Sequence, residues 1–234
     1  TNNYITVIEK DTFRNLEVRQ IILLRNSIKI IEDGAFANLI NLDTIDLYQN
    51  HLSTINSNSF INLPSLTFID LSFNRIKYLQ RGVFGFCKAP SVHIYLACNE
   101  ISDIDDSFEG TLNTRFDLDL GGNRIDRLPV AIFDGHSFIQ VDVRFNPLEK
   151  VSKDFCNNNC VIDAFYFECS VTSVEAGESI MKWAEGKQVR VLSRPCSYLK
   201  MNFVSVPWRG CNEGPSVRGY KGLVGVLLVV FFCT

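Results

Sequence analysis

Two neighbouring stretches share one pattern: LDTIDLYQNHLSTINSNSFINLP at residues 42–64 and LTFIDLSFNRIKYLQRGVFGF at residues 66–86. In each, the leucine of an Ile-Asp-Leu triplet stands three residues before an asparagine. An aliphatic residue follows two positions after this asparagine, and a phenylalanine follows ten positions after it. A period of this length indicates a repeat architecture, so we searched the whole chain of 234 residues for further copies.

The pattern recurs from the first residues to about residue 155. One asparagine returns at steps of 23 to 25 residues, at Asn3, Asn26, Asn50, Asn74, Asn99, Asn123 and Asn146. We call these the ladder asparagines. A phenylalanine follows each of them nine or ten positions later, at Phe13, Phe36, Phe60, Phe84, Phe108, Phe133 and Phe155.

The positions around each asparagine predict one coil of a solenoid. Apolar residues five and three positions before it alternate with polar ones, which is typical of a short strand with one buried face. Stacking such strands from successive repeats gives a parallel sheet along one side of the coil. The asparagine amide can satisfy the backbone groups of the turn that follows. The phenylalanines are expected to fill the other half of each coil.

These segments resemble the 24-residue type of leucine-rich repeat found in Toll-like receptor ectodomains, Slit-like proteins and small matrix proteoglycans. The resemblance implies an α/β-type solenoid of about six to seven repeats in residues 1–155, the first of them incomplete. Its expected form is a right-handed horseshoe with short parallel strands on the concave face and mostly irregular or 3-10 segments on the convex face. Extracellular relatives carry a cysteine cap before the first repeat, so we expect the true N-terminus to precede Thr1.

Residues 156–211 are expected to form a C-terminal cysteine-rich cap. The resemblance to the family's cysteine flank lies in Trp183, the Pro195–Cys196 pair and a closing Cys211. The disulfide candidates are Cys156, Cys160, Cys169, Cys196 and Cys211. Our hypothesis is that the last two each pair with one of the first three, although the spacing departs from the family pattern and leaves the pairing open. A zinc site is disfavoured because there is no paired short cysteine spacing or nearby histidine.

Two further cysteines lie within the repeats. Cys87 occupies a position held elsewhere by leucine and is predicted to be a buried free thiol. Cys98 lies at the rim of the sheet, and its expected direction disfavours a bond to Cys87.

The chain ends in a polar spacer, residues 212–221, and a hydrophobic tail, residues 222–234, with the sequence GLVGVLLVVFFCT. The tail is shorter than the roughly 20 apolar residues that span a bilayer. A small residue at the attachment site, a polar spacer and an apolar tail are the parts of a glycosylphosphatidylinositol signal. Their presence here favours such an anchor attached at Asn212. A transmembrane helix cut short and a buried terminal strand are the alternatives.

The composition argues against several functional classes. A net charge of −3 and the absence of a Lys/Arg block disfavour a nucleic-acid partner. The three histidines stand at different places in their repeats without a nucleophile motif, so we expect no enzyme, no cofactor and no metal. Eight cysteines, five of them in residues 156–211, indicate an oxidising compartment.

Binding is the remaining class, and the outward strand positions of the concave face would carry it. Aromatic side chains dominate interface hot spots, and several of them fall in these positions. The predicted ligand-binding residues are Tyr48, Phe68, Asp70, His93, Tyr95, Phe116 and Asp119. Phe73 and Phe145 are also expected to point outward. Two alternatives stay open: flanking loops shield the rings, and the recurring aspartates form only a solvated stripe.

The sequence thus predicts an extracellular, cell-surface protein, membrane-anchored, that recognises a protein ligand or co-receptor in adhesion, development or innate immunity. The rival hypotheses are the truncated ectodomain of a transmembrane signalling receptor and a secreted structural matrix protein.

Overall fold

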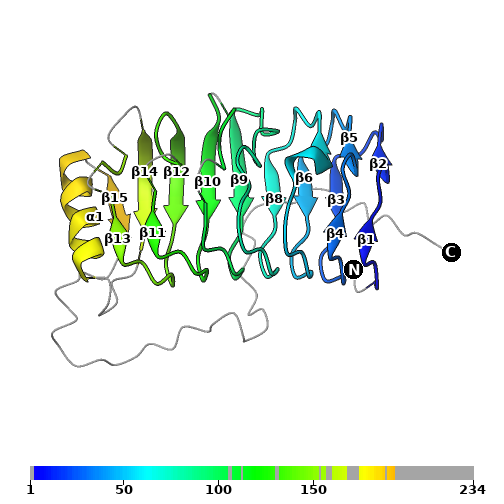
Figure 1. The fold of residues 1–234 in the computed structure, drawn as a ribbon. Helices are drawn as coiled ribbons and strands as arrows, with labels where there is room; N and C mark the ends of the chain where they lie inside the picture. Colours follow the sequence, from blue (N-terminus) through cyan, green and yellow to red (C-terminus); the bar gives the residue numbers. More distant parts are fainter. Residues whose placement is uncertain are drawn as a thin grey trace.

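The computed structural model describes residues 3–104, 107–111, 113–129, 132–152, 154–156, 160–167, 174–187 and 189–192. Its main feature is one sheet of eight strands, all parallel, stacked side by side along one side of the molecule (Figure 1). In order, the strands are β3 (Gln20–Ile22), β6 (Thr44–Asp46), β8 (Phe68–Asp70), β9 (Ser91–Tyr95), β10 (Arg115–Asp119), β12 (Ser137–Asp142), β14 (Val161–Tyr166) and β15 (Arg190–Leu192).

The opposite side of the coils carries small parallel sheets of two-residue strands. They are β1 (Val7–Ile8) with β4 (Ile30–Ile31), β2 (Phe13–Arg14) with β5 (Phe36–Ala37) and β7 (Phe60–Ile61), and β11 (Arg127–Leu128) with β13 (Lys150–Val151). Within the described residues this side has a single 3-10 turn, η1 (Ser57–Ser59). The predicted solenoid of parallel strands with few helices is confirmed, and short strands stand where irregular segments were expected.

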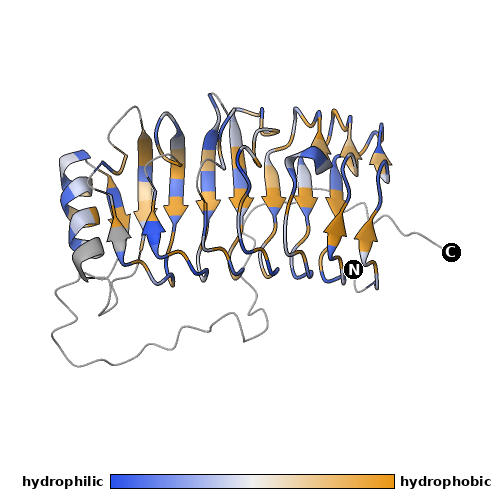
Figure 2. Cartoon of the chain, viewed as in Figure 1, coloured by the Kyte–Doolittle hydropathy of each residue, from blue (hydrophilic) through white to orange (hydrophobic). Residues whose placement is uncertain are grey.

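Alternation along each strand places the core between the two sides. Ile45, Ile69, Ile94, Leu118 and Val141, each five positions before a ladder asparagine, are fully buried. The strands of the large sheet therefore carry hydrophobic and hydrophilic bands in turn (Figure 2). Because each coil buries its apolar residues against its neighbours, stability comes from the interfaces between coils.

From Asn50 onward, the ladder asparagines tie each coil to the one before it. The Asn74 Nδ2 donates to the carbonyls of Leu47 and Leu71, both at 3.0 Å, and the Leu52 N–H donates to Asn74 Oδ1 at 2.9 Å. The same three bonds recur at Asn50, Asn99, Asn123 and Asn146. This confirms that the amide satisfies the backbone of the turn.

The residue before each ladder asparagine from Asn26 to Asn146 adopts a left-handed backbone. Its φ lies between 54° and 67° at Arg25, Gln49, Phe73, Cys98, Gly122 and Phe145. Left-handed backbone disfavours residues other than glycine by about 1–2 kcal/mol, yet only one of the six is glycine. The hydrogen bonds of the adjacent asparagine offset this cost in every coil.

The phenylalanine column is continuous but forks in the fourth coil. Rings stack from Phe13 through Phe36 to Phe60, with centroids 5.2 and 5.3 Å apart. The next ring in this stack is Phe86, at 4.8 Å from Phe60, and not Phe84 as the repeat predicts. Phe84 instead packs on Phe108 at 5.0 Å, because the fourth coil supplies two phenylalanines two residues apart.

Helix α1 (Val174–Lys187) packs at the end of the stack opposite β1 (Figure 1). Ile180 and Ala184 are buried, and the ring of Trp183 lies 4.8 Å from Phe155 and 6.1 Å from Phe165. The helix therefore covers apolar side chains of the last coils.

The cysteines partly differ from expectation. Cys156 and Cys160 form a disulfide with each other, which corrects the hypothesis that Cys196 and Cys211 each reach back to one of the upstream three. The two cysteines are four residues apart in sequence, and their Cα atoms lie 5.1 Å apart. Cys87 is a buried free thiol, as predicted, and burial raises its pKa. Cys98 is disulfide-bonded. Cys169, Cys196, Cys211, Asn212 and the segments 212–221 and 222–234 lie outside the described residues.

Replacing Asn74 by alanine is expected to lower the free energy of unfolding by about 1–3 kcal/mol, because buried backbone groups of two coils lose their partner. Denaturant unfolding followed by circular dichroism measures this change. Asn41→Ala, at an exposed asparagine outside the ladder, is the matched control and should stay within about 0.5 kcal/mol of wild type. Equal stability of the two variants would show that the ladder bonds contribute nothing.

Candidate recognition surface

The outward positions of the eight-stranded sheet form two columns across its face. Six positions before the ladder asparagines stand Thr44, Phe68, His93, Asp117 and Gln140, which pair in register from β6 to β12. Four positions before them stand Asp46, Asp70, Tyr95, Asp119 and Asp142, paired in the same way. We call this surface the sheet face.

Aromatic side chains gather in the middle of the sheet face. Phe68 and Tyr95 meet edge to face with ring centroids 5.3 Å apart, and Tyr48 lies 5.1 Å from Phe73. The His93 ring lies 6.5 Å from Tyr95. We call these five residues the aromatic cluster. All five are half-buried, so their outward direction is as predicted but their exposure is partial.

Phe116 does not belong to this surface, which corrects the prediction. Its side chain is fully buried, with the ring 4.6 Å from Phe108 and 5.9 Å from Phe138. The reason is the period of two: Phe116 stands two residues before the inward Leu118 and therefore faces the core. Asp117 occupies the outward position. Counting six positions back from Asn123 identifies it from the sequence.

Asp117 links three strands of the sheet face. It accepts a hydrogen bond from Gln140 Nε2 at 2.6 Å, and its other oxygen lies 2.9 Å from His93 Nδ1. The hydrogen bond to Asp117 raises the pKa of His93, partial burial opposes this, and the charge of Asp117 adds to the rise. The protonated imidazole is therefore stabilised, with an effect present below pH 6.5 and lost as the pH rises through the raised pKa. The sequence analysis missed both Asp117 and Gln140.

The recurring aspartates cap the strand ends and are not merely a solvated stripe. Oδ1 of Asp46, Asp70 and Asp119 accepts the backbone N–H two residues later at 2.8 to 2.9 Å. Asp70 is buried beside the aromatic cluster, and desolvation raises its pKa from 3.8 to about 6 against the opposing Ser72 hydrogen bonds. Desolvation also raises the pKa of Asp46.

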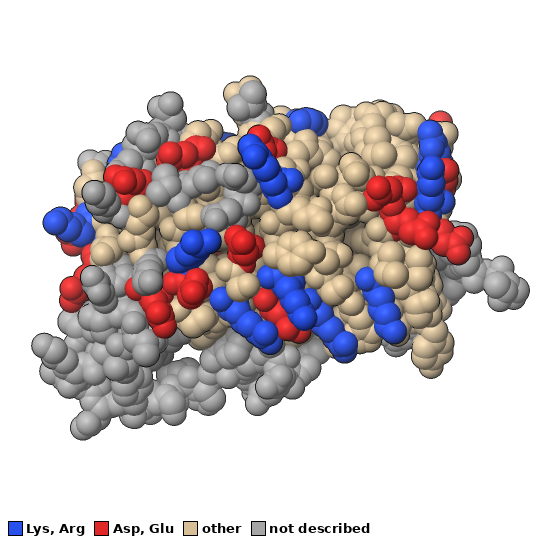
Figure 3. All heavy atoms as spheres, viewed as in Figure 1, with Lys and Arg blue, Asp and Glu red and all other residues tan. Residues whose placement is uncertain are grey.

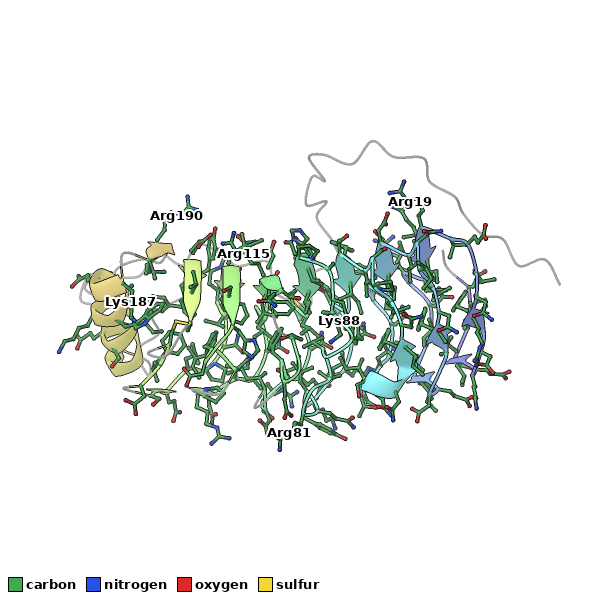
Figure 4. All side chains as sticks on the ribbon, turned by 90° about the horizontal axis from the view of Figure 1, so that it is seen from above. Arg19, Arg81, Lys88, Arg115, Lys187 and Arg190 are labelled. Atoms are coloured by element: carbon green, nitrogen blue, oxygen red, sulfur yellow. A yellow bond between two sulfur atoms is a disulfide. The ribbon has the colours of Figure 1, made fainter. Side chains whose placement is uncertain are left out.

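Basic side chains occupy other parts of the sheet face. Arg144 forms an ion pair with Asp142 and lies with its guanidinium carbon 5.3 Å from the Tyr166 ring centre. Arg19, Arg115 and Arg190 lie on the side of the molecule that carries the eight-stranded sheet, whereas Arg81 lies on the opposite side (Figure 4). Arg19 forms an ion pair with Asp43 at 3.2 Å, and Arg115 forms one with Asp163 at 2.6 Å. The aromatic cluster thus sits between basic groups near the two ends of the sheet.

The geometry suits a large flat ligand better than a small molecule. Two of the cavities in the described part of the chain are lined by other residues and by none of the aromatic cluster. Among the described residues no three His, Cys, Asp or Glu side chains are placed to hold a metal ion. No described helix has the length and apolarity needed to span a bilayer.

Parallel coils, buried asparagines and a flat outer sheet define a parallel-strand solenoid. A family model described as leucine rich repeat matches residues 16–76, and one described as BspA type leucine rich repeat region (6 copies) matches residues 53–180. The second covers more than half of the chain, which therefore belongs to the leucine-rich repeat proteins. No curated protein matches the sequence.

Solved structures share the fold at low sequence identity. The crystal structure of the APL1 leucine-rich repeat domain is 16% identical with a TM-score of 0.50, over 74% of this chain and 42% of that one. The LRIM1/APL1C complex is 16% identical with a TM-score of 0.51, over 79% and 30%. The TLR13–ssRNA13 complex is 19% identical with a TM-score of 0.47, over 82% and 34%. The chain thus spans less than half of each of these relatives.

Replacing Asp70 by asparagine is expected to stabilise the protein above pH 6. The amide oxygen can still accept the Ser72 N–H, and no buried charge remains. Because the folded-state pKa of Asp70 is raised, wild type loses stability as the pH rises from 3.8 to about 6. The gain of the variant should reach about 1–3 kcal/mol at pH 8 and vanish near pH 4.

Thermal and denaturant unfolding at both pH values measure this difference. Asp126→Asn, at an exposed carboxylate, serves as the control. A gain of the same size at both pH values would contradict the assignment.

Proposed function

We propose that this protein recognises another protein through the aromatic cluster on the sheet face. The observation that carries the proposal is the contact between Phe68, Tyr95 and His93, which comes from two neighbouring strands and lies on a rigid sheet. Half-buried aromatic rings held in place can enter an interface at a small cost in side-chain entropy.

A protein partner accounts for the surroundings of the cluster better than the other ligand classes. The aspartate column runs through it at Asp46, Asp70 and Asp119, and carboxylates repel the phosphates of a nucleic acid. Small-molecule sites are usually concave, and two of the cavities of the described residues lie away from the cluster. The LRIM1/APL1C structure is that of a complex, which accords with this type of partner. In this mechanism the sheet holds the aromatic cluster in a fixed arrangement for the partner to bind, and the protein catalyses no reaction.

The proposed location is the cell surface or the extracellular space. The Cys156–Cys160 disulfide and the disulfide-bonded Cys98 support an oxidising compartment. A lipid anchor at Asn212 would place the protein at the membrane and require a co-receptor for signalling. Adhesion, development and innate immune recognition are the proposed settings. The truncated ectodomain of a signalling receptor and a secreted matrix protein remain the rival hypotheses.

The double variant Phe68→Ala, Tyr95→Ala is expected to weaken partner binding roughly thirtyfold, the effect of losing one hot spot. The probe is an array of purified extracellular proteins from the same source, screened with the tetramerised wild-type chain. Hits are then titrated with both proteins.

The control Ile30→Ala, Ile40→Ala removes two exposed isoleucines away from the sheet face and should bind like wild type. Melting above the assay temperature verifies that each variant is folded. Undiminished binding by the double variant would end the proposal for this surface.

The anchoring hypothesis predicts that phosphatidylinositol-specific phospholipase C releases the tagged full-length product from the surface of animal cells. Surface staining and immunoblotting of the medium, before and after treatment, measure the release. An Asn212→Leu variant, which blocks attachment, should not reach the surface. Retention of the wild-type product after treatment would favour a spanning segment.

A further inference from the structure

The three-stranded sheet β2–β5–β7 ends abruptly at β7. Along this sheet the N–H of one asparagine donates to the next coil: Asn15 to Ala37 O at 3.0 Å and Asn38 to Ile61 O at 2.9 Å. On this side of the molecule, the following coil passes through turns over residues 81–86 and forms no strand that pairs with β7. Within the described residues, the Asn62 N–H consequently has no backbone acceptor.

A row of hydrogen-bonded asparagine side chains follows the same sheet and also ends beside β7. Asn38 Nδ2 donates to Asn15 Oδ1, and Asn62 Nδ2 donates to Asn38 Oδ1, both at 3.1 Å. Asn62 is exposed, and no described residue donates to its Oδ1. The β7 edge therefore presents one backbone donor and one amide acceptor that the earlier coils use to pair with their neighbours.

A groove lies beside this edge. Its volume is about 430 Å³, and it runs between Ile61 and Asn62 on one side and Phe86 and Lys88 on the other, with Gly82 and Gly85 also lining it. The two glycines keep the fourth coil narrow: a Cβ on Gly85 would lie 3.0 Å from the Gly82 carbonyl oxygen. We call this cavity the β7 groove.

The chemistry of the groove walls combines apolar and basic groups. Ile61 is 47% exposed, and Phe86 closes the apolar wall. Lys88 is the one charged residue among those lining the groove, and its Nζ lies 3.2 Å from the Gly110 carbonyl. On this side of the molecule, Figure 3 shows Lys and Arg interspersed with Asp and Glu, with an uncharged area in the upper middle of the view.

We propose that the β7 groove binds an extended segment of a partner protein, which adds a strand alongside β7. Open donors and acceptors on a strand edge are satisfied by an extended backbone, and alternate side chains of the added strand then contact the groove. An apolar side chain of the segment packs on Ile61 and Phe86. An acidic side chain faces Lys88, whose charge no lining residue balances. This site is separate from the sheet face and does not rest on the function proposed there.

The test is selection of peptides from a phage-displayed random dodecapeptide library on the immobilised full chain. Selected peptides are synthesised and titrated by fluorescence anisotropy. We expect acidic peptides with alternating apolar residues. Ile61→Lys and Asn62→Gly should each weaken their binding at least tenfold, since glycine keeps the left-handed backbone of Asn62 at φ 54° while removing its amide.

Controls separate this site from the rest of the surface. Ile40→Lys places the same charge at an equally exposed isoleucine outside the groove and should leave binding unchanged. Lys88→Glu should reject the acidic peptides, which tests the groove even if Ile61→Lys fails to fold. N-methylation of the single peptide N–H that faces Asn62 Oδ1 should weaken binding, whereas N-methylation at the two neighbouring positions should not. Peptides insensitive to all the groove variants, or lost instead with Phe68→Ala, Tyr95→Ala, would overturn the proposal.

Discussion

The stack of coils depends on one buried amide per repeat. Each coil turns sharply where its strand ends, and the backbone there adopts a left-handed conformation with carbonyls that have no partner in the sheet. The amide of the ladder asparagine donates to two of these carbonyls and accepts one N–H, and two of the three partners belong to the preceding coil. The bond set therefore shapes the turn and fixes the spacing of coils at once. Strand pairing and the phenylalanine stack follow from that spacing.

Much of this architecture could be predicted because it repeats. Seven copies of one asparagine determine the period, and the period of two within each strand determines which residues enter the core. One error contradicts the periodicity itself: Phe116 was placed outward although the period of two directs it, like Leu118, toward the core. Other errors occurred where local detail outweighs periodicity, as where Phe86 joins the ring stack although the repeat favours Phe84. Neither the Cys156–Cys160 pairing nor the open edge of β7 follows from a repeat pattern, because each depends on one turn.

The candidate surface was predicted less completely than the fold. Outward residues are identified by counting, and three of those found in this way, Phe68, His93 and Tyr95, lie together in the structure. Counting does not show which outward groups contact one another. The bridge from His93 through Asp117 to Gln140 needs three coils in register, and the burial of Asp70 needs the packed rings beside it. Both properties arise from neighbours about 24 residues apart in sequence, so no single repeat contains them.

The left-handed residue before each ladder asparagine has a consequence for how such proteins diversify. Arginine, glutamine, phenylalanine, cysteine and glycine all occupy this position with nearly the same φ, because the strain is offset by the neighbouring amide and not by the residue itself. The side chain stands at the rim, away from the core. The side chains along this edge of the molecule can thus be changed one coil at a time by single substitutions, while the spacing of the coils stays the same. New specificities can arise there without compensating mutations elsewhere.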